Sequence, residues 1–219
     1  MGASSRDWGN NSGISDMKKI VLYTAILGKT GRFLVPVVSD KSVDRICFTD
    51  LNLQSYFYEI RKTRVKDRIS VRRQRFVKII IPDEIFYGYE YSVYVDCKRP
   101  YSVDYEKLLK HLQPGSDFLT RRHNRRSCLY DEGEFCIKKK KDSEETIRRQ
   151  LDYYKSEGCP AHCGLHASGL LLRRHTKQMK EFSRLWWEQV KAYSFRDQIS
   201  LPYVAWKTGA KISVCGRGV

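Results

Sequence analysis

The chain has 219 residues, which suits one α/β domain with a substantial core and leaves little room for a second. Lys and Arg outnumber Asp and Glu by 41 to 25, giving a net charge of +16. Such an excess favours an anionic partner: nucleic acid, a phosphorylated ligand or an anionic membrane surface. Charge alone does not choose among these.

The cysteines and the apolar runs indicate the compartment. Seven cysteines form an odd set without a secretory leader, so we expect reduced thiols and a cytoplasmic protein. No run approaches the roughly 20 apolar residues of a transmembrane helix. Any membrane contact would therefore be peripheral.

Residues 1–16 differ in composition from the rest of the chain. They read MGASSRDWGNNSGISD, rich in Gly, Ser and Asn, and stop directly before Met17 and an apolar run. We interpret them as a disordered leader or a remnant of expression. The folded domain is expected to span 17–219.

Three apolar and β-branched runs predict buried strands. KIVLYTAI spans Lys19–Ile26 and is closed by Gly28; RICFTD follows at Arg45–Asp50, and YSVYVD at Tyr91–Asp96. A continuous apolar run of this kind is typical of a strand buried on both faces of a parallel sheet.

Helical patterns separate and follow these runs. Val71, Phe76 and Ile79 recur at helical spacing before Pro82 interrupts the pattern. Boundary signals then predict helices over Ser143–Gly158 and Lys177–Tyr193. Helices alternating with strands indicate an α/β fold.

Asp96 is the first candidate site residue. In an open α/β sheet ligands gather at the carboxyl ends of the strands, and Asp96 directly follows YSVYV. Mg²⁺ and Mn²⁺ prefer carboxylate oxygens and keep substrate phosphates as further ligands, so one protein carboxylate can suffice. A turn aspartate that caps the next segment explains the position equally simply.

Arg72, Arg75 and Lys78 are spaced by three along the first predicted helix. They therefore share one broad face and could reach a single diphosphate. A solvated basic face has the same spacing.

Two polar segments carry weaker signals. Cys159 to His166 holds potential zinc ligands, but it lacks a paired C-x-x-C, so buried or loop thiols are the better interpretation. Four consecutive lysines at 138–141 predict an exposed loop without a catalytic role.

The aromatic residues of the carboxyl-terminal part have helical spacing, which is typical of core positions. One or two could line an acceptor site. They are Trp186, Trp187, Tyr193, Phe195, Tyr203 and Trp206.

Read together, the segments resemble the GT-A-like glycosyltransferases once catalogued only as a domain of unknown function, from plants, bacteria and large DNA viruses. The resemblance runs from about Lys18 to Lys207 in order and spacing. In size and start the chain also resembles the N-terminal domain of a chlorella-virus glycosyltransferase, which suits one domain of a longer protein. The matching segments are KIVLYTAILG, ICFTD, the R-x-x-R-x-x-K helix, YVDCK, VDYEKLL, FLTRRHNRRSCLYDEGE, LDYYKSEG, GLLLRRH and SFRDQISLPYVAWK.

This resemblance implies a Rossmann-like fold with a mixed, mostly parallel central sheet flanked by helices. It implies metal-dependent transfer of a sugar from a nucleotide-diphosphate donor, expected to be a UDP-sugar, to a glycan or other hydroxyl acceptor. Base and ribose contacts map onto Tyr23, Thr24, Ala25 and Asp50. The diphosphate would be neutralised by the basic helix residues Arg75 and Lys78, with Arg72.

The metal motif of the family is only partly present. Asp96 matches its last carboxylate, while Tyr94 stands where the first aspartate is usual and Cys97 where relatives often have glycine. Tyr94 and Val95 are expected to contact the donor. The resemblance makes His175 a further ligand for Mn²⁺ or Mg²⁺.

For proton transfer the resemblance favours Asp197, in the triplet Arg-Asp-Gln before an apolar helix, although helix capping is an alternative role. Glu132 and Glu134 are weaker candidates. Arg121 and His123 are expected to contact sugar or phosphate.

Two other functions remain open on the sequence. A basic nucleic-acid-binding module would fit the charge, but no recognition motif such as an aromatic RNA-binding strand, a zinc knuckle or a basic region with heptads is present, so no specific nucleic acid is expected. A transferase homologue that binds donor without turnover would fit the missing first aspartate.

Overall fold

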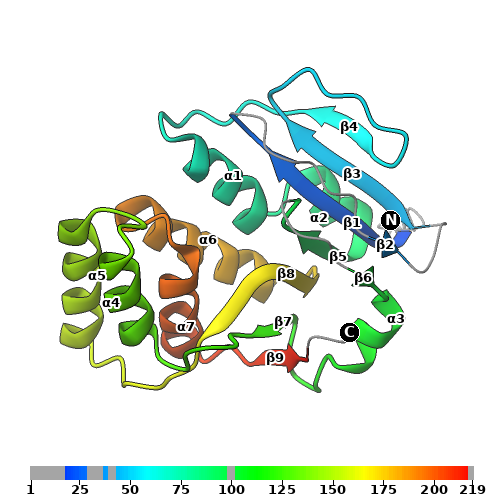
Figure 1. Cartoon of the computed structure of the whole chain (residues 1–219). Helices are drawn as coiled ribbons and strands as arrows, with labels where there is room; N and C mark the ends of the chain where they lie inside the picture. The colour runs from blue at the N-terminus through cyan, green and yellow to red at the C-terminus, as the bar shows by residue number, and fades with distance from the viewer. Residues whose placement is uncertain (1–17, 29–36, 39–42, 98–101, 217–219) are drawn as a thin grey trace, which may run out of the picture.

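The computed structural model describes residues 18–28, 37–38, 43–97 and 102–216, so the predicted leader lies outside the described residues. Its main element is a seven-stranded sheet in the order β4-β3-β1-β5-β8-β7-β9 (Figure 1). The strands are β1 (Lys18–Ile26), β3 (Asp44–Thr49), β4 (Glu59–Lys62), β5 (Tyr89–Val95), β7 (Phe118–Arg122), β8 (His166–Arg174) and β9 (Ile212–Cys215). β2 (Val37–Val38) and β6 (Ser102–Val103) form a separate pair.

The sheet is mixed because one strand runs against the others. β1 pairs in parallel with β3 and β5, β3 with β4, and β7 with β9. β8 is antiparallel to both of its neighbours, β5 and β7. The mixed, mostly parallel sheet expected from the sequence is confirmed.

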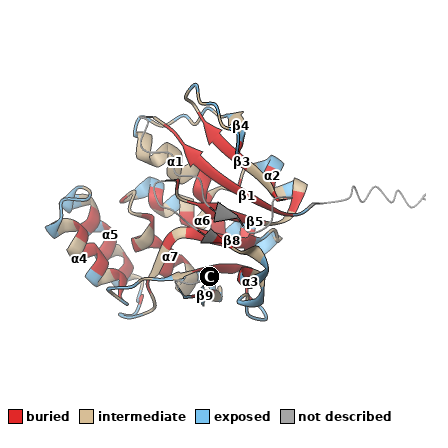
Figure 2. Ribbon diagram, turned by 45° about the vertical axis from the view of Figure 1, so that its right-hand side comes forward, coloured by how far each residue is buried: buried red, intermediate tan, exposed pale blue. Residues whose placement is uncertain are grey.

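Alternate residues of β1 enter two hydrophobic layers, as the period of two along a strand requires. Val21, Tyr23 and Ala25 belong to one cluster of buried residues, while Ile20 and Leu22 belong to the other. The central strands are buried along most of their length, whereas the helices are buried along one side (Figure 2).

Most helices cover the first of these layers. It receives buried side chains from α1 (Ser70–Ile79), α2 (Asp83–Gly88), α4 (Leu129–Lys138), α5 (Glu144–Ser156), α6 (Lys177–Ala192) and α7 (Asp197–Thr208), whereas α3 (Tyr105–Lys110) covers the second.

The helix boundaries follow the sequence signals. Pro82 separates α1 from α2, and Ser143 accepts a hydrogen bond from the Thr146 amide to cap α5. Thr176 caps α6 in the same way, through the amide of Met179. α6 then buries Phe182 and Trp186 on its inner side, as its apolar spacing predicts.

Candidate active site

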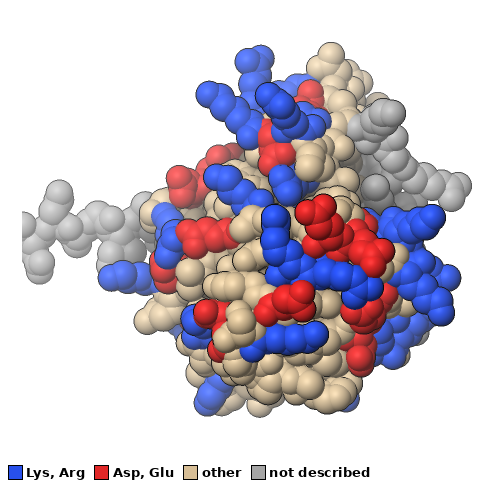
Figure 3. Space-filling model, turned by 90° about the vertical axis from the view of Figure 1, so that its left-hand side faces the viewer, with Lys and Arg blue, Asp and Glu red and all other residues tan. Residues whose placement is uncertain are grey.

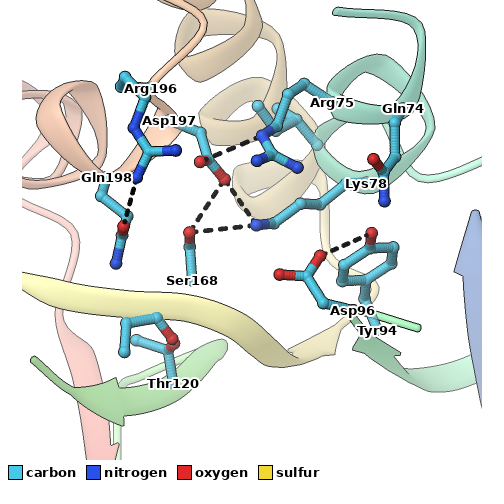
Figure 4. A network of polar contacts seen from close by, with 12 residues as sticks. Gln74, Arg75, Lys78, Tyr94, Asp96, Thr120, Ser168, Arg196, Asp197 and Gln198 are labelled. Carbon is cyan, nitrogen blue, oxygen red and sulfur yellow. Dashed lines mark hydrogen bonds and ion pairs between the residues drawn. The ribbon is translucent and has the colours of Figure 1, made fainter. Parts of the chain in front are cut away.

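A network of charged side chains links α1, α7 and β8 (Figure 4). At its centre, Asp197 Oδ2 lies 2.6 Å from Lys78 Nζ, and Asp197 Oδ1 lies 3.2 Å from Arg75 Nε. The Ser168 hydroxyl donates to Asp197 Oδ2 at 2.9 Å and accepts from Lys78 Nζ at 3.1 Å. The two predicted diphosphate ligands thus meet one carboxylate.

The network is buried, and burial decides its electrostatics. The side chains of Lys78 and Asp197 are 1% and 3% exposed, and that of Arg75 is 14% exposed. Burial opposes ionisation of Asp197, yet the charges of Arg75 and Lys78 outweigh it and hold the pKa of this carboxyl well below its usual range. Burial lowers the pKa of Lys78, offset in part by Asp197 and Asp96.

A β-bulge in β8 places Ser168 in this network. Thr120 of β7 pairs with Leu171, but the next residue, Arg121, pairs with Ala167, so the register shifts between them. Thr120 Oγ1 secures the extra residues of β8 from both sides, at 3.1 Å from Ala167 O and 2.8 Å from Leu170 O. Bulges commonly redirect side chains beside functional sites, and here the redirected residue is Ser168.

Asp96 lies beside the same bulge, at the carboxyl end of β5. Its amide donates to Gly169 O at 2.9 Å, and its Oδ1 accepts from the Tyr94 hydroxyl at 3.1 Å. Tyr94 and Val95 are fully buried, so their predicted contacts with the donor are wrong, whereas Asp96 is partly exposed. The negative charge of Asp96 also acts on Arg75 and Lys78. Asp96 is therefore the accessible carboxylate beside a buried network.

A buried arginine holds the carboxyl end of α1. Arg173 of β8 has no exposed surface, and its guanidinium donates to Ile79 O at 3.0 Å and to Lys78 O at 2.9 Å. It also donates to the Tyr23 hydroxyl. Arg173 thus secures the backbone of Lys78, a role that the sequence analysis missed. The available signal was a charged residue inside the apolar run GLLLR.

A second polar cluster follows β7. Glu132 of α4 is buried and lies 2.6 Å from Arg126 Nη2 and 3.8 Å from His123 Nε2. Burial lowers the pKa of His123, although Glu132 acts in the opposite direction. Arg196 lies next to the main network, and its positive charge favours a lower pKa at both Asp197 and Cys136. Cys136 Sγ lies 3.4 Å from the Glu132 carboxylate. The two clusters are therefore neighbours.

Comparison with known proteins identifies the family of this chain. Residues 59–215 match the model of the family described as TOD1/MUCI70, glycosyltransferase-like domain. The chain belongs to this family. The family predicted from the sequence is thereby confirmed, and the chain is a glycosyltransferase-like domain.

One curated relative and two solved structures show how far the similarity extends. A probable hexosyltransferase MUCI70 of Arabidopsis thaliana is 28% identical over 150 residues, 64% of this chain and 26% of the relative. The chain thus spans about a quarter of that relative's length.

Among solved structures, a WbbM bifunctional glycosyltransferase in its apo form superimposes with a TM-score of 0.54 and 15% identity, over 92% of this chain and 39% of that one. This likeness shows the fold. Mouse xyloside xylosyltransferase 1, also in its apo form, gives a TM-score of 0.47 and 9% identity, over 90% of this chain and 84% of that one.

Three of the four predicted base and ribose contacts are wrong. Tyr23, Thr24 and Ala25 have no exposed surface, so their side chains cannot meet a nucleotide. The Tyr23 hydroxyl binds Arg173, and Thr24 Oγ1 donates to Val95 O at 2.7 Å. These polar atoms hold the centre of the sheet together.

Asp50, the fourth predicted nucleotide contact, directly follows β3, at the carboxyl end of that strand. It is partly exposed and accepts from the Gly28 amide and from Arg73 Nη1, each at 2.9 Å. Gly28 has a φ of +84°, and a Cβ there would lie 2.6 Å from Ser70 Cβ, so this close contact with α1 requires glycine.

The expected second metal ligand, His175, is far from Asp96, and this prediction was wrong. The His175 amide pairs with Glu90 O at the start of β5, while the Asp96 amide pairs with Gly169 O at its end. Six residues of strand separate the two positions, roughly 20 Å.

The ring of His175 is also occupied. Its Nδ1 lies 2.6 Å from Tyr89 O and its Nε2 2.8 Å from Ser92 Oγ. Because a carbonyl only accepts, Nδ1 carries the hydrogen and Nε2 accepts the serine hydroxyl. No lone pair of this ring is left for a cation.

The remaining predicted ligands occupy different places. Arg72 Nη2 lies 3.4 Å from Tyr193 O, beyond the end of α6, and so Arg72 does not join Arg75 and Lys78 on Asp197. Arg121 lies near the end of β7, opposite Cys215 of β9, and its positive charge opposes the rise that burial causes in the pKa of the Cys215 thiol. Glu134 is exposed and lies 3.3 Å from Arg148.

The weaker sequence signals have structural explanations. All seven cysteines lie within the described residues and none forms a disulfide; Cys159 and Cys163 have their sulfurs 3.6 Å apart. Over the described ranges, no three His, Cys, Asp or Glu side chains are grouped so as to hold a metal ion, and no helix there could cross a membrane. Lys138–141 are exposed, and Trp186 and Tyr203 are buried, as expected.

Proposed function

We propose that this domain transfers a hexosyl group from a nucleotide-diphosphate sugar, a UDP-sugar, to a hydroxyl acceptor on a glycan. The observation that carries the proposal is the buried network of Arg75, Lys78, Ser168 and Asp197 beside the accessible Asp96, in a member of a glycosyltransferase-like family. It lies at the carboxyl end of β5, an edge where ligands bind in open α/β sheets.

Charge balance supports a divalent cation in this reaction. The two cations Arg75 and Lys78 already face two carboxylates, Asp197 and Asp96. A diphosphate adds further negative charge, which this set does not neutralise. A single, partly exposed carboxylate such as Asp96 suits Mn²⁺ or Mg²⁺, since these ions take their other ligands from phosphate oxygens and water. When bound, the cation would stabilise the negative charge of the departing diphosphate.

The protein groups have separate roles in this proposal. Arg75, whose side chain is 14% exposed, offers planar donors to phosphate oxygens, whereas the buried Lys78 contributes its positive charge without direct contact. Asp197 positions both cations, and Ser168 bridges the Lys78–Asp197 pair. This replaces the base role predicted for Asp197, because a carboxylate whose pKa is held low by two cations is a weak base.

Glu132 is also an unsuitable base. Its carboxylate is buried and paired with Arg126 at 2.6 Å. His123 lies on the same carboxylate, so this cluster is more suited to shaping the neighbouring surface than to accepting a proton from a substrate.

Binding and turnover test the proposal separately. UDP-sugars with Mn²⁺ should raise the melting temperature, because a ligand specific to the folded state stabilises it. Asp96→Asn should lose metal-dependent donor hydrolysis at least about 100-fold while staying folded. The matched control is Asp152→Asn, which changes an exposed aspartate of α5. Wild-type turnover by Asp96→Asn would remove Asp96 from the mechanism.

A donor-binding homologue without turnover is the second candidate. The observation that favours it is Tyr94, which is fully buried and hydrogen-bonded to Asp96 at the position where the resemblance implies a first aspartate. Chromatography of the products after incubation with UDP-sugar and Mn²⁺ separates the two. A thermal shift without free UDP or transferred sugar would identify the inactive homologue.

A further inference from the structure

Outside the active site, a row of exposed cations joins β4 to α1. Residues 62–68 read KTRVKDR, and alternate members face outward. Lys62, Arg64, Lys66 and Arg68 are exposed, whereas the three residues between them are half-buried. We call these four residues the cation row. It is outside the network of Arg75 and Lys78.

The residues between the cations hold the row in place. The Thr63 amide donates to Thr49 O at 2.9 Å, and Val65 packs against the hydrophobic core. Asp67 turns its carboxylate to the Ile69 amide, at 2.8 Å. The cation row is therefore anchored by its own backbone and by its inward side chains.

Most of this charge has no protein counterion. Among the residues that the structure describes, the side chains of Arg64, Lys66 and Arg68 take part in no hydrogen bond or ion pair, and Lys62 bonds to Leu51 O and Asn52 Oδ1. In Figure 3 the upper part of the face carries mainly Lys and Arg, whereas both signs mix below it. By contrast, the exposed Arg148 of α5 is paired with Glu134 and Glu144.

Apolar groups accompany the cations along the same sheet edge. Ile69, which follows the row, is 40% exposed, and it lines an open hollow of about 720 Å³ with Lys66, Arg68 and Arg72. At the other end of β4, Tyr56 is fully exposed and Phe57 is 56% exposed. β4 is the outermost strand, so both of its ends lie at the rim of the molecule (Figure 1).

We propose that this rim docks on the surface of an anionic phospholipid membrane. Lys and Arg are attracted to anionic headgroups, and aromatic side chains favour the interface between headgroups and acyl chains. The cation row begins at Lys62, the last residue of β4, and the aromatics precede the strand, so the near ends of the two groups are roughly 13 Å apart. A flat bilayer can meet both ends of this strand together.

The arrangement is less suited to a nucleic acid. Proteins that bind single strands place aromatic rings among the cations, so that bases stack while phosphates are neutralised. Residues 62–69 contain no aromatic side chain. The row leads directly into α1, which carries Arg75 and Lys78, so docking would bring the active site close to the membrane.

Vesicle co-sedimentation with the full chain tests this proposal, and it does not depend on transferase activity. The wild type should bind phosphatidylcholine vesicles only when they contain phosphatidylserine, and binding should weaken as salt rises. Replacing all four residues of the cation row by Gln should weaken binding by about two to three orders of magnitude.

The chain offers a matched control. Replacing Lys138–141 by Gln removes the same charge from another exposed segment and should leave most of the binding intact. Melting temperatures of both quadruple variants confirm that they fold. The double variant Tyr56→Ser/Phe57→Ser should weaken binding in a manner that persists at high salt, because these contacts are apolar.

Several outcomes would overturn the proposal. The first is that the wild type does not bind anionic vesicles, and the second is that both quadruple variants lose the same amount of vesicle binding. The third is that the chain binds single-stranded RNA through the cation row and does not bind vesicles. An inactive transferase that still binds anionic vesicles through the row would contradict the proposed function and support the membrane proposal.

Discussion

Two sets of cations close together in the sequence have opposite environments. Arg75 and Lys78 turn inward from α1 to Asp197, whereas the cation row of residues 62–68 faces solvent. Both sets are Lys and Arg in a strongly basic segment. The inward pair therefore depends on its counterion for folding, while the outward row is available to a partner.

The difference comes from the local backbone. After Lys62 the row follows an irregular segment in which every second side chain is exposed. In α1 a spacing of three places Arg75 and Lys78 on the side that faces α7 and β8. A buried cation without a partner is costly, which makes Asp197 a structural requirement as well as a site residue.

Removing the counterion should give the largest effect. Asp197→Asn leaves Lys78 and Arg75 buried without their carboxylate, and we expect a loss of about 3–5 kcal/mol in the free energy of unfolding. Urea denaturation at neutral pH measures it. The control is Glu188→Gln, which breaks an exposed ion pair with Arg184 and should cost less than about 1 kcal/mol. Equal losses in the two variants would show that the network is not buried in solution.

The second largest effect concerns pH. Burial lowers the pKa of His175 to about 4, below the ordinary value of 6.5, so the folded state stays neutral while the unfolded state takes up a proton. The unfolded state binds more protons in this window, so stability is complete above pH 6.5 and falls as the pH approaches 4. We expect His175 to contribute about 2–3 kcal/mol of this loss.

Comparing urea denaturation near the two ends of that window tests it. The variant His175→Gln should show a smaller loss than the wild type. If the free energy of unfolding falls by the same amount across this pH window in both proteins, the ring of His175 is solvated in the folded protein.

The hydroxyl that supports the arginine should come third. Tyr23→Phe removes one partner of the buried Arg173, and a hydrogen bond to a charged group contributes about 2 kcal/mol. Tyr203→Phe is a suitable control, because its hydroxyl lies 3.5 Å from that of Tyr153 and should contribute less than about 0.5 kcal/mol. If both variants unfold at the same urea concentration, Arg173 does not rely on Tyr23.

The cation row should give the smallest effect on folding. Each single change to Gln at Arg64, Lys66 or Arg68 is expected to alter the free energy of unfolding by less than about 0.5 kcal/mol. Urea curves of the three variants provide the values. A loss above 1.5 kcal/mol at any of them would mean that the row is part of the folded core.

The sequence was sufficient for the elements whose signals are local. The strand at Lys18–Ile26, the break at Pro82 and the Ser143 cap of α5 follow from composition and spacing. The position of Asp96 at a strand end and the shared helix face of Arg75 and Lys78 were also predictable, because each depends on one element.

Features that depend on two strands were not predictable. The histidine error arose because β8 is antiparallel to β5, which carries His175 away from the end of the sheet where Asp96 lies. Ser168 was missed because a bulge has no signal in a single strand; it appears only in the pairing of Thr120 and Arg121 with β8. The role of Arg173 was not predictable either, because it depends on the packing of the end of α1 against β8.

The contacts of Arg173 also bear on motion. The carboxyl end of α1 is fastened to β8, whereas the amino end begins at Ser70 without a side-chain cap or an acidic residue in its first turn. Helix ends without such support fray. Amide hydrogen exchange should therefore be slow at Lys78 and Ile79 and fast near Ser70. At its amino end α1 relies on side-chain contacts instead, through the ion pair of Arg73 with Asp50 and the packing of Ser70 on Gly28.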